Sequence, residues 1–260
     1  MLLHLHNVSK VYKIGDEQIK ALNEVSAEVE EGEFVAVMGP SGSGKSTFLQ
    51  VASLLATADS GQIRLKDKAI EKFSEVELAR LRNKEIGFIF QQFNLLARTS
   101  ALENVALPLV YAGVPVDEQK KRAIEMLGKV GLSDRMQNTP AQLSGGQQQR
   151  VAIARALVNN PAIIFADEPT GNLDSKSGED IKKLLIQLHE EGKTIVMVTH
   201  EAEIAEIAKR LMLFHDGEII YDDKFGFNLK VQTEKTLEYV QSLKRQGKKV
   251  RMSFGKRTGK

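Results

Sequence analysis

An eight-residue loop between a strand-like run and a helix-forming stretch constrains this fold more than any other feature. Gly39–Ser46 reads Gly-Pro-Ser-Gly-Ser-Gly-Lys-Ser and matches the phosphate-loop pattern G-x-x-x-x-G-K-[ST]. The largely apolar run Glu33–Met38 fits a buried strand, and Ser46–Leu55 fits a helix. The pattern requires this order of strand, loop and helix, so an ordinary Gly/Ser turn is the weaker interpretation.

The residue types in this loop suit the phosphates of Mg-ATP. Glycines allow backbone N–H groups to surround phosphate oxygens, and the helix directs its positive end at them. Lys45 would neutralise the β- and γ-phosphates, and Ser46 would offer its hydroxyl to Mg²⁺. We expect ATP contacts along the whole loop, from Gly39, Pro40, Ser41, Gly42, Ser43, Gly44, Lys45, Ser46 and Thr47.

Two carboxylates follow another apolar run, Ile163–Ala166. A carboxylate at the end of a buried strand beside a phosphate loop is typical of a Mg²⁺ anchor, and this role suits Asp167. Glu168 is one residue further on, so its side chain points elsewhere and could polarise the attacking water as a general base. The alternative, a surface Asp-Glu pair that opens a turn before Pro169, is common when no phosphate loop is present.

The remaining pattern predicts an α/β fold with a mostly parallel sheet covered by helices. Asp216-Gly217 between two apolar runs predicts a hairpin. The stretch 100–156 is mainly helical, with breaks at 113–115, 131 and 139–140. Other expected elements are buried strands at Ile86–Phe90, Ala162–Ala166 and Thr194–Val198, a half-exposed strand at Gly61–Lys66, and a helix from about Ser177 to Glu190.

Charge divides the chain into two units. Residues 224–260 hold 11 Lys/Arg and 2 Asp/Glu, whereas residues 1–223 hold 25 Lys/Arg and 32 Asp/Glu. We therefore expect a domain at 1–223, with a helical insertion at about 92–158, and a basic extension at 224–260. The extension could adhere to anionic lipid, but charge runs are more often simply solvated.

Composition excludes several classes of protein. The chain has no Cys, which excludes disulfides and thiolate zinc sites. It has neither an apolar run long enough to span a bilayer nor the pattern of a signal peptide, so we expect no membrane crossing by this chain.

A further segment, Leu143–Arg150, reads Leu-Ser-Gly-Gly-Gln-Gln-Gln-Arg. Ser-Gly-Gly before helix formers creates a second helix N-terminus that can bind an anion, although alone it could be a flexible cap. In the order phosphate loop, Leu143–Gln147, Asp167-Glu168 and His200, the chain resembles the nucleotide-binding domain of ABC (ATP-binding cassette) transporters. The resemblance covers residues 1 to about 223.

This resemblance implies a P-loop NTPase with a RecA-like core, an N-terminal antiparallel β subdomain and an inserted helical subdomain. It implies a head-to-tail homodimer with two ATP molecules at the interface. The implied roles are adenine stacking for Tyr12, Mg²⁺ and partner sensing for Gln91, a D-loop aspartate for Asp174, a γ-phosphate switch for His200, and contact with the other subunit's γ-phosphate for Ser144, Gly145, Gly146 and Gln147.

A narrower resemblance, carried by Ile86–Leu96, Ala101–Leu109 and Ala166–Asp174, is to the subgroup serving macrolide exporters, lipoprotein release and cell division. It implies an integral membrane permease that docks near Gln91 and the helical subdomain, and a peripheral location on the cytoplasmic face of the membrane. The chain would power transport or, alternatively, transmit force or signals without moving solute.

Other classes fit less well. A DNA-repair ATPase of the same family would carry long coiled coils or zinc-binding cysteines between the motifs. A GTPase would carry an Asn-Lys-x-Asp motif, which is absent. The basic extension has little aromatic interleaving, so we expect no nucleic-acid partner.

Overall fold

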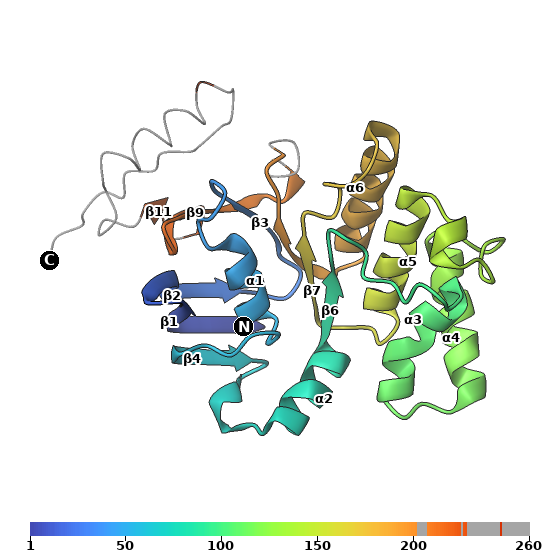
Figure 1. The fold of residues 1–260 in the computed structure, drawn as a ribbon, viewed down its shortest axis with the longest axis horizontal. Helices are drawn as coiled ribbons and strands as arrows, with labels where there is room; N and C mark the ends of the chain where they lie inside the picture. The colour runs from blue at the N-terminus through green and yellow to red at the C-terminus, as the bar shows by residue number, and fades with distance from the viewer. Residues whose placement is uncertain (202–206, 225, 228–244, 246–260) are drawn as a thin grey trace, which may run out of the picture.

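The computed structural model describes residues 1–201, 207–224, 226–227 and 245. Most of the basic extension expected at 224–260 lies outside these residues. Within them, two sheets and a group of helices form the fold, and Figure 1 shows the antiparallel sheet and the helices α3–α5 on opposite sides of the central strands.

The central sheet has the strand order β11-β10-β9-β3-β8-β7-β6 among the described residues. Neighbours from β9 to β6 pair in parallel, and every residue of β3 and β8 is buried, as expected for a parallel sheet covered on both faces. The strands are β3 (Phe34–Met38), β6 (Ile86–Ile89), β7 (Ile163–Asp167), β8 (Thr194–Val198), β9 (Arg210–His215), β10 (Glu218–Asp222) and β11 (Gly226–Phe227). The α/β prediction is confirmed.

Two details of this sheet refine the predictions. The hairpin at Asp216-Gly217 is confirmed, and both residues have positive φ (47° and 80°), as a type I′ turn requires. The buried strand predicted at Ile86–Phe90 is present as β6, but it is only half-buried. Since β6 lies at the edge of the described sheet and ends at Ile89, only Gly87 and Ile89 are buried.

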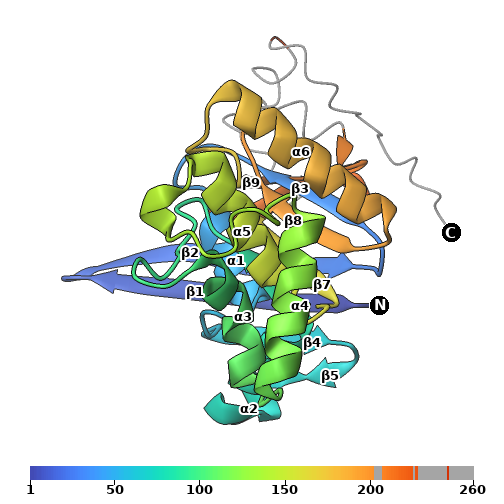
Figure 2. The ribbon, with the colours of Figure 1, turned by 90° about the vertical axis from the view of Figure 1, so that its right-hand side faces the viewer.

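A second sheet, of strand order β2-β1-β4-β5, is antiparallel. Its strands are β1 (Leu3–Ile14), β2 (Glu17–Val29), β4 (Ser60–Leu65) and β5 (Lys68–Ala69). Ile63 and Leu65 alternate with exposed residues in β4, which confirms the half-exposed strand predicted there. Figure 2 shows β1 and β2 as a long hairpin that extends beyond the rest of the sheet.

Helices cover the central sheet and form the lateral group. The α-helices are α1 (Lys45–Ala52), α2 (Glu75–Glu85), α3 (Ala101–Tyr111), α4 (Val116–Lys129), α5 (Gly145–Leu157) and α6 (Ser175–Glu190); short 3₁₀ turns occur at Ile70–Lys72 and Pro140–Gln142. The predicted breaks at 113–115, 131 and 139–140 all separate helices. None of the helices in the described residues combines the length and apolar character needed to cross a bilayer.

The strand β7 contributes to two apolar cores. Ile164 and Ala166 pack with the helical group, including α5 and α6. Ile163 and Phe165, on the opposite face, pack with α1 and the antiparallel sheet. Because side chains alternate along a strand, β7 is held from both sides, and Asp167 and Glu168 follow directly at its end.

Candidate active site

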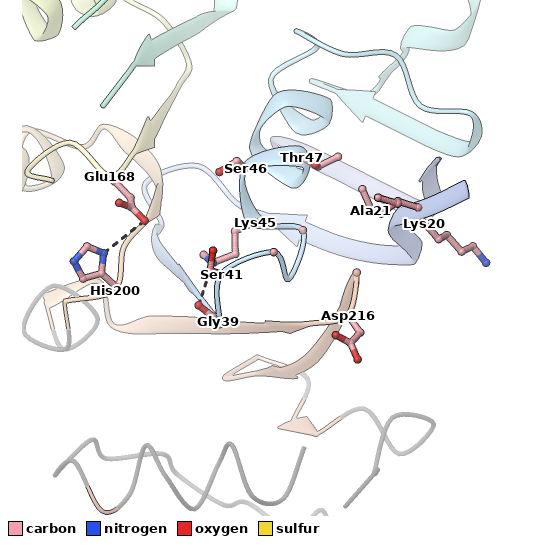
Figure 3. Close-up of a pocket in the computed structure, with 14 residues that line it drawn as sticks. Lys20, Ala21, Gly39, Ser41, Lys45, Ser46, Thr47, Glu168, His200 and Asp216 are labelled. Carbon is pink, nitrogen blue, oxygen red and sulfur yellow. Dashed lines mark hydrogen bonds and ion pairs between the residues drawn. The ribbon is translucent and has the colours of Figure 1, made fainter. Parts of the chain in front are cut away.

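The phosphate loop and the ends of two parallel strands surround a cleft of about 650 Å³. Glu168 follows β7 and His200 follows β8, so both reach the cleft at the carboxyl edge of the sheet, where open α/β folds bind ligands (Figure 3). The lining residues are Ile19, Lys20, Ala21, Gly39, Ser41, Gly42, Gly44, Lys45, Ser46, Thr47, Glu168, His200, Asp216 and Gly217.

Gly44 shows why the loop needs glycine. It caps the N-terminus of α1 with a φ of 100°, which side chains strongly disfavour. A Cβ atom there would also lie 2.4 Å from the carbonyl oxygen of Ala21. Only glycine therefore lets the start of α1 approach β2 this closely, with the helix N-terminus directed into the cleft.

Lys45 lies over the loop that precedes it. Its ammonium donates to the carbonyl oxygens of Gly39 (3.0 Å) and Pro40 (2.8 Å). Burial lowers the pKa of Lys45, and the negative charges of Glu168 and Asp167 oppose that shift. The loop thus holds a cation where the phosphates of a nucleotide would lie.

Two oxygen groups that could bind a metal ion lie together at the edge of the cleft, where Ser46 lines it and Asp167 contacts Ser46. The hydroxyl of Ser46 donates to Oδ1 of Asp167 across 3.4 Å. Burial raises the pKa of Asp167, as does the charge of Glu168, while the Ser46 hydroxyl and Lys45 partly offset both. The described residues hold no cluster of three or more acidic, His or Cys ligands. One carboxylate and one hydroxyl fit Mg²⁺, which usually completes its shell with water and substrate phosphates.

Glu168 and His200 lie on the same side of the cleft and point toward each other (Figure 3), with 3.5 Å between Oε1 of Glu168 and Nδ1 of His200. Glu168 has a φ of 42°, a left-handed conformation that is uncommon for a residue other than glycine. This conformation turns the chain out of β7. The arrangement suits a carboxylate that accepts a proton from water, next to an imidazole that can donate a hydrogen bond.

The structure places two other expected residues beside the cleft, not among its lining residues. Tyr12 pairs with Ile19 across the β1–β2 hairpin and is 38% exposed. Gln91 follows β6, and its carbonyl oxygen accepts a hydrogen bond from Asn172 (3.1 Å). A Cβ on Gly171 would lie 2.8 Å from Nε2 of Gln91, so this side chain packs against the turn after Glu168.

The segment Ser144–Gln147 lies at the start of α5 and does not line the cleft. Ser144 accepts from the backbone N–H of Gln147 (3.3 Å), and the Gln147 side chain accepts from the N–H of Ser144 (2.9 Å). The helices α2 and α3 begin with the same device but with Glu in place of Gln. The neutral amide caps α5 without adding a negative charge, so its positive end stays suited to an anion.

Asp174 lies beside this segment, at the start of α6. Its carboxylate accepts from Ser177, and this hydrogen bonding lowers the pKa of Asp174. A Cβ on Gly146 would lie 2.7 Å from Oγ of Ser177, so α5 and α6 begin in close contact. One copy of the chain therefore gathers two separate groups: the cleft, and the paired starts of α5 and α6.

Three polar contacts near the cleft were not anticipated. Gln149 donates to the carbonyl oxygen of Pro169, and Thr170 donates to Glu201. Arg155 of α5 donates to the carbonyls of Phe93 and Asn94 in the segment after Gln91. Arg150, also on α5, donates to the carbonyl oxygen of Val130 and to the carboxylate of Asp180 in α6. Each contact joins distant segments, so no local pattern could reveal it.

Comparison with known proteins places this geometry in a family. A family model described as "ABC transporter" matches residues 22–171. The chain is 51% identical to the macrolide export ATP-binding/permease protein MacB of Chlorobaculum tepidum, over 86% of this chain and 34% of that protein. It is 51% identical to an ABC transporter ATP-binding protein of Thermotoga maritima, over 84% of this chain and 93% of that protein. It thus spans about a third of the macrolide export relative.

A solved structure is also similar. The dimeric post-hydrolysis structure of the ATP-binding cassette MJ0796 with ADP and Pi aligns with a TM-score of 0.79 and 48% identity. The alignment covers 85% of this chain and 98% of that one. ADP and phosphate, the products of ATP hydrolysis, thus occur in a cassette of the same fold.

Proposed function

Because the chain belongs to the ABC transporter family and is an ATPase of that family, we propose that it powers a membrane permease as a head-to-tail dimer with two ATP molecules at the interface. The observation that carries this proposal is the separation of two phosphate-binding elements. The start of α5, with Ser144–Gln147, is absent from the lining of the cleft that holds Lys45, Glu168 and His200.

A second copy of the chain would bring these elements together. A nucleotide on the phosphate loop has one side open to solvent, and the helix N-terminus of a partner would close that side and add N–H donors. Closure would depend on the γ-phosphate, so hydrolysis would release it. The dimeric structures of the MJ0796 cassette support such an assembly.

We propose the hydrolytic roles that the family resemblance implies; the geometry of the cleft supports those of Lys45, Glu168 and His200. Backbone N–H groups of Gly39–Thr47 and the ammonium of Lys45 would bind the phosphates. Mg²⁺, held by Ser46, Asp167 and Gln91, would neutralise charge on the β- and γ-phosphates. Glu168 would accept a proton from the attacking water, and His200 would contact the γ-phosphate. Tyr12 would stack on adenine, and Asp174 would lie at the dimer interface.

The similarity to MacB supports an integral membrane permease as the partner, and with it a place on the cytoplasmic face of the membrane. We propose that the permease docks on the segment after Gln91 and on the helices α3–α5. An alternative within the same family is a regulatory ATPase that transmits force or signals without moving solute. Purification with the membrane partner, followed by a solute-flux assay in vesicles, separates the two: ATP-dependent flux supports transport.

Mixing two inactive variants tests the head-to-tail arrangement. Lys45→Ala disables the phosphate loop. Ser144→Asp retains a good helix cap but directs a negative charge at the γ-phosphate of the other subunit. Each variant alone should have little ATPase activity. In a mixed dimer one site carries both defects and the other carries none, so mixing should restore activity.

Restored activity at a 1:1 ratio would support the two-copy site, with each variant mixed with itself as the control. If both motifs served the same copy's nucleotide, every chain in the mixture would still be defective. Activity that stays at the level of the separate variants would therefore contradict the proposal.

A further inference from the structure

Gln149 is a fully buried polar residue outside the proposed nucleotide-binding segments. It lies on α5, two residues after Gln147, and has no exposed surface. Its Nε2 donates to the carbonyl oxygen of Pro169 across 2.7 Å, a short distance for such a bond. The hydrogen bond connects the helix that begins at Ser144 with the turn that follows the carboxylates of β7.

Within the described part of the chain, the oxygen atom of the same side-chain amide has no hydrogen-bond partner in its buried position. Oε1 of Gln149 is buried and accepts no hydrogen bond from the residues that the structure describes. An unpaired buried carbonyl destabilises a fold, whereas a methionine or leucine of similar volume would fill the space without that cost. Packing alone therefore does not explain why an amide occupies this position. The hydrogen bond that its N–H group donates to Pro169 does explain it.

The acceptor of this bond is adjacent to the proposed base. Pro169 follows Glu168, whose φ of 42° places it in a strained left-handed conformation. The turn closes through a hydrogen bond from the N–H of Gly171 to the carbonyl oxygen of Glu168 (3.0 Å). Such a conformation persists only where the surrounding structure stabilises it. The hydrogen bond from Gln149 on α5 fixes the carbonyl group of Pro169, the residue that follows Glu168.

We propose that Gln149 is a positioning residue for the general base: its amide fixes the carbonyl of Pro169 and thereby the direction of the Glu168 carboxylate. This inference rests on the proposed role of Glu168. The proposal also assigns α5 a role at two nucleotide sites. The helix start would meet the γ-phosphate of one site, and Gln149, little more than one turn later, would hold the base of the other.

The first test replaces Gln149 with Met in the full chain and measures steady-state ATPase activity and thermal stability. Since misplacing a reacting group by about 1 Å can cost a hundredfold in rate, kcat should fall at least about tenfold, while KM for ATP should change less than about twofold. The melting temperature should change by only a few degrees, because the variant removes the unpaired Oε1 of Gln149 but leaves the carbonyl oxygen of Pro169 without this donor.

Gln148→Met is the matched control. Gln148 is the preceding residue, half-buried, and donates to the carbonyl of Leu143 within the same helix start, not to the turn after Glu168. It loses a similar hydrogen bond, and its kcat should remain near that of the wild type. Equal losses of kcat in both variants would overturn the proposal, because they would show a general effect on α5.

A double variant shows whether Gln149 acts through Glu168. In a Glu168→Gln background, Gln149→Met should lower kcat by less than about twofold, because the base that it positions is already lost. A full tenfold loss in that background would overturn the inference. If Glu168→Gln alone kept wild-type turnover, the proposed role of Glu168 as the base would be wrong. If instead Glu168→Gln were slow but Gln149→Met kept the wild-type kcat, only the positioning role of Gln149 would be wrong.

Gln149→Glu provides a second, nearly isosteric variant if the Met variant does not fold. A protonated carboxyl can donate to Pro169, whereas an ionised one cannot. The activity of this variant, divided by that of the wild type at each pH, should rise as the pH falls. A ratio that is independent of pH would contradict a role for the donor.

Discussion

Burial acts against the charged forms of two side chains in the cleft. It lowers the pKa of Lys45 and raises the pKa of Asp167. Each group lies near opposite charge, which partly offsets the effect of burial. Phosphates beside Lys45 and a divalent cation beside Asp167 would strengthen both charged forms, so the cleft is electrostatically suited to a metal–nucleotide complex.

At this scale, Lys45→Ala should weaken ATP binding itself. A hydrogen bond to a charged group contributes roughly 1.5–3 kcal/mol, so the Kd for ATP should rise about ten- to a hundredfold. Equilibrium binding of a fluorescent ATP analogue checks this. Lys193→Ala, which removes a surface ammonium bonded to Asn160, is the control and should bind normally. An unchanged Kd for Lys45→Ala would argue against the phosphate loop as the binding site.

Three helices begin with the same capping box, but the charge of its last residue differs between them. Ser74 with Glu77 and Ser100 with Glu103 form capping boxes at α2 and α3, and the glutamates add negative charge that suits a helix N-terminus. At α5 the same box contains Gln147. The first two caps stabilise their helices, whereas the third leaves its helix start ready for an anion.

The cap of α3 predicts a pH effect on stability. Backbone and side-chain hydrogen bonds from Ser100 lower the pKa of Glu103 from its ordinary value of 4.5. A lowered folded-state pKa means that Glu103 stabilises the fold fully above about pH 4.5 and that this contribution is lost as the pH falls through the folded-state pKa. Glu103→Gln should therefore destabilise the chain at pH 7, and its difference from the wild type should shrink as the pH falls below about 4.5.

Chemical denaturation at several pH values measures this change. Glu118→Gln is a suitable control, because Glu118 forms an exposed pair with Arg122 within α4 and does not cap a helix. A Glu103→Gln defect that stays constant between pH 7 and pH 3 would show that the carboxylate charge contributes nothing to the cap.

The elements that the sequence revealed share strong local signals. β3, β8 and the hairpin turn at Asp216 are short, apolar or marked by turn residues, so pattern alone predicted them. The hairpin of β1 and β2 came only from the family resemblance, because register shifts between Leu5 and Val11 interrupt the alternation. The pattern gave no sign of α2, because it is polar, has no buried residue and depends on its cap.

The candidate site could be predicted from the sequence to a similar extent. The phosphate loop and the carboxylates after β7 are contiguous motifs with a chemical meaning of their own, and the structure brings them together. The contacts of Gln149 and Arg155 join segments that lie far apart in the chain. Such contacts follow from tertiary packing, so only the folded structure could reveal them.

At the scale of the whole molecule, Glu168→Gln should separate binding from hydrolysis. Without a carboxylate to accept the proton, turnover should fall about a hundredfold or more, while the phosphate loop should still bind ATP. The unhydrolysed γ-phosphate would then keep two copies together. Size-exclusion chromatography with light scattering should show a dimer with ATP and a monomer with ADP. Near-wild-type turnover would contradict the assignment of the base.

The position of β7 between the two cores has a consequence for how the molecule loses activity on heating. Ile164 and Ala166 belong to one core, and Ile163 and Phe165 to the other. If either half melted, the strand would lose the packing on one face, and the carboxylates at its end would lose their alignment. A partly unfolded molecule would therefore retain no hydrolytic activity, whichever half opened first.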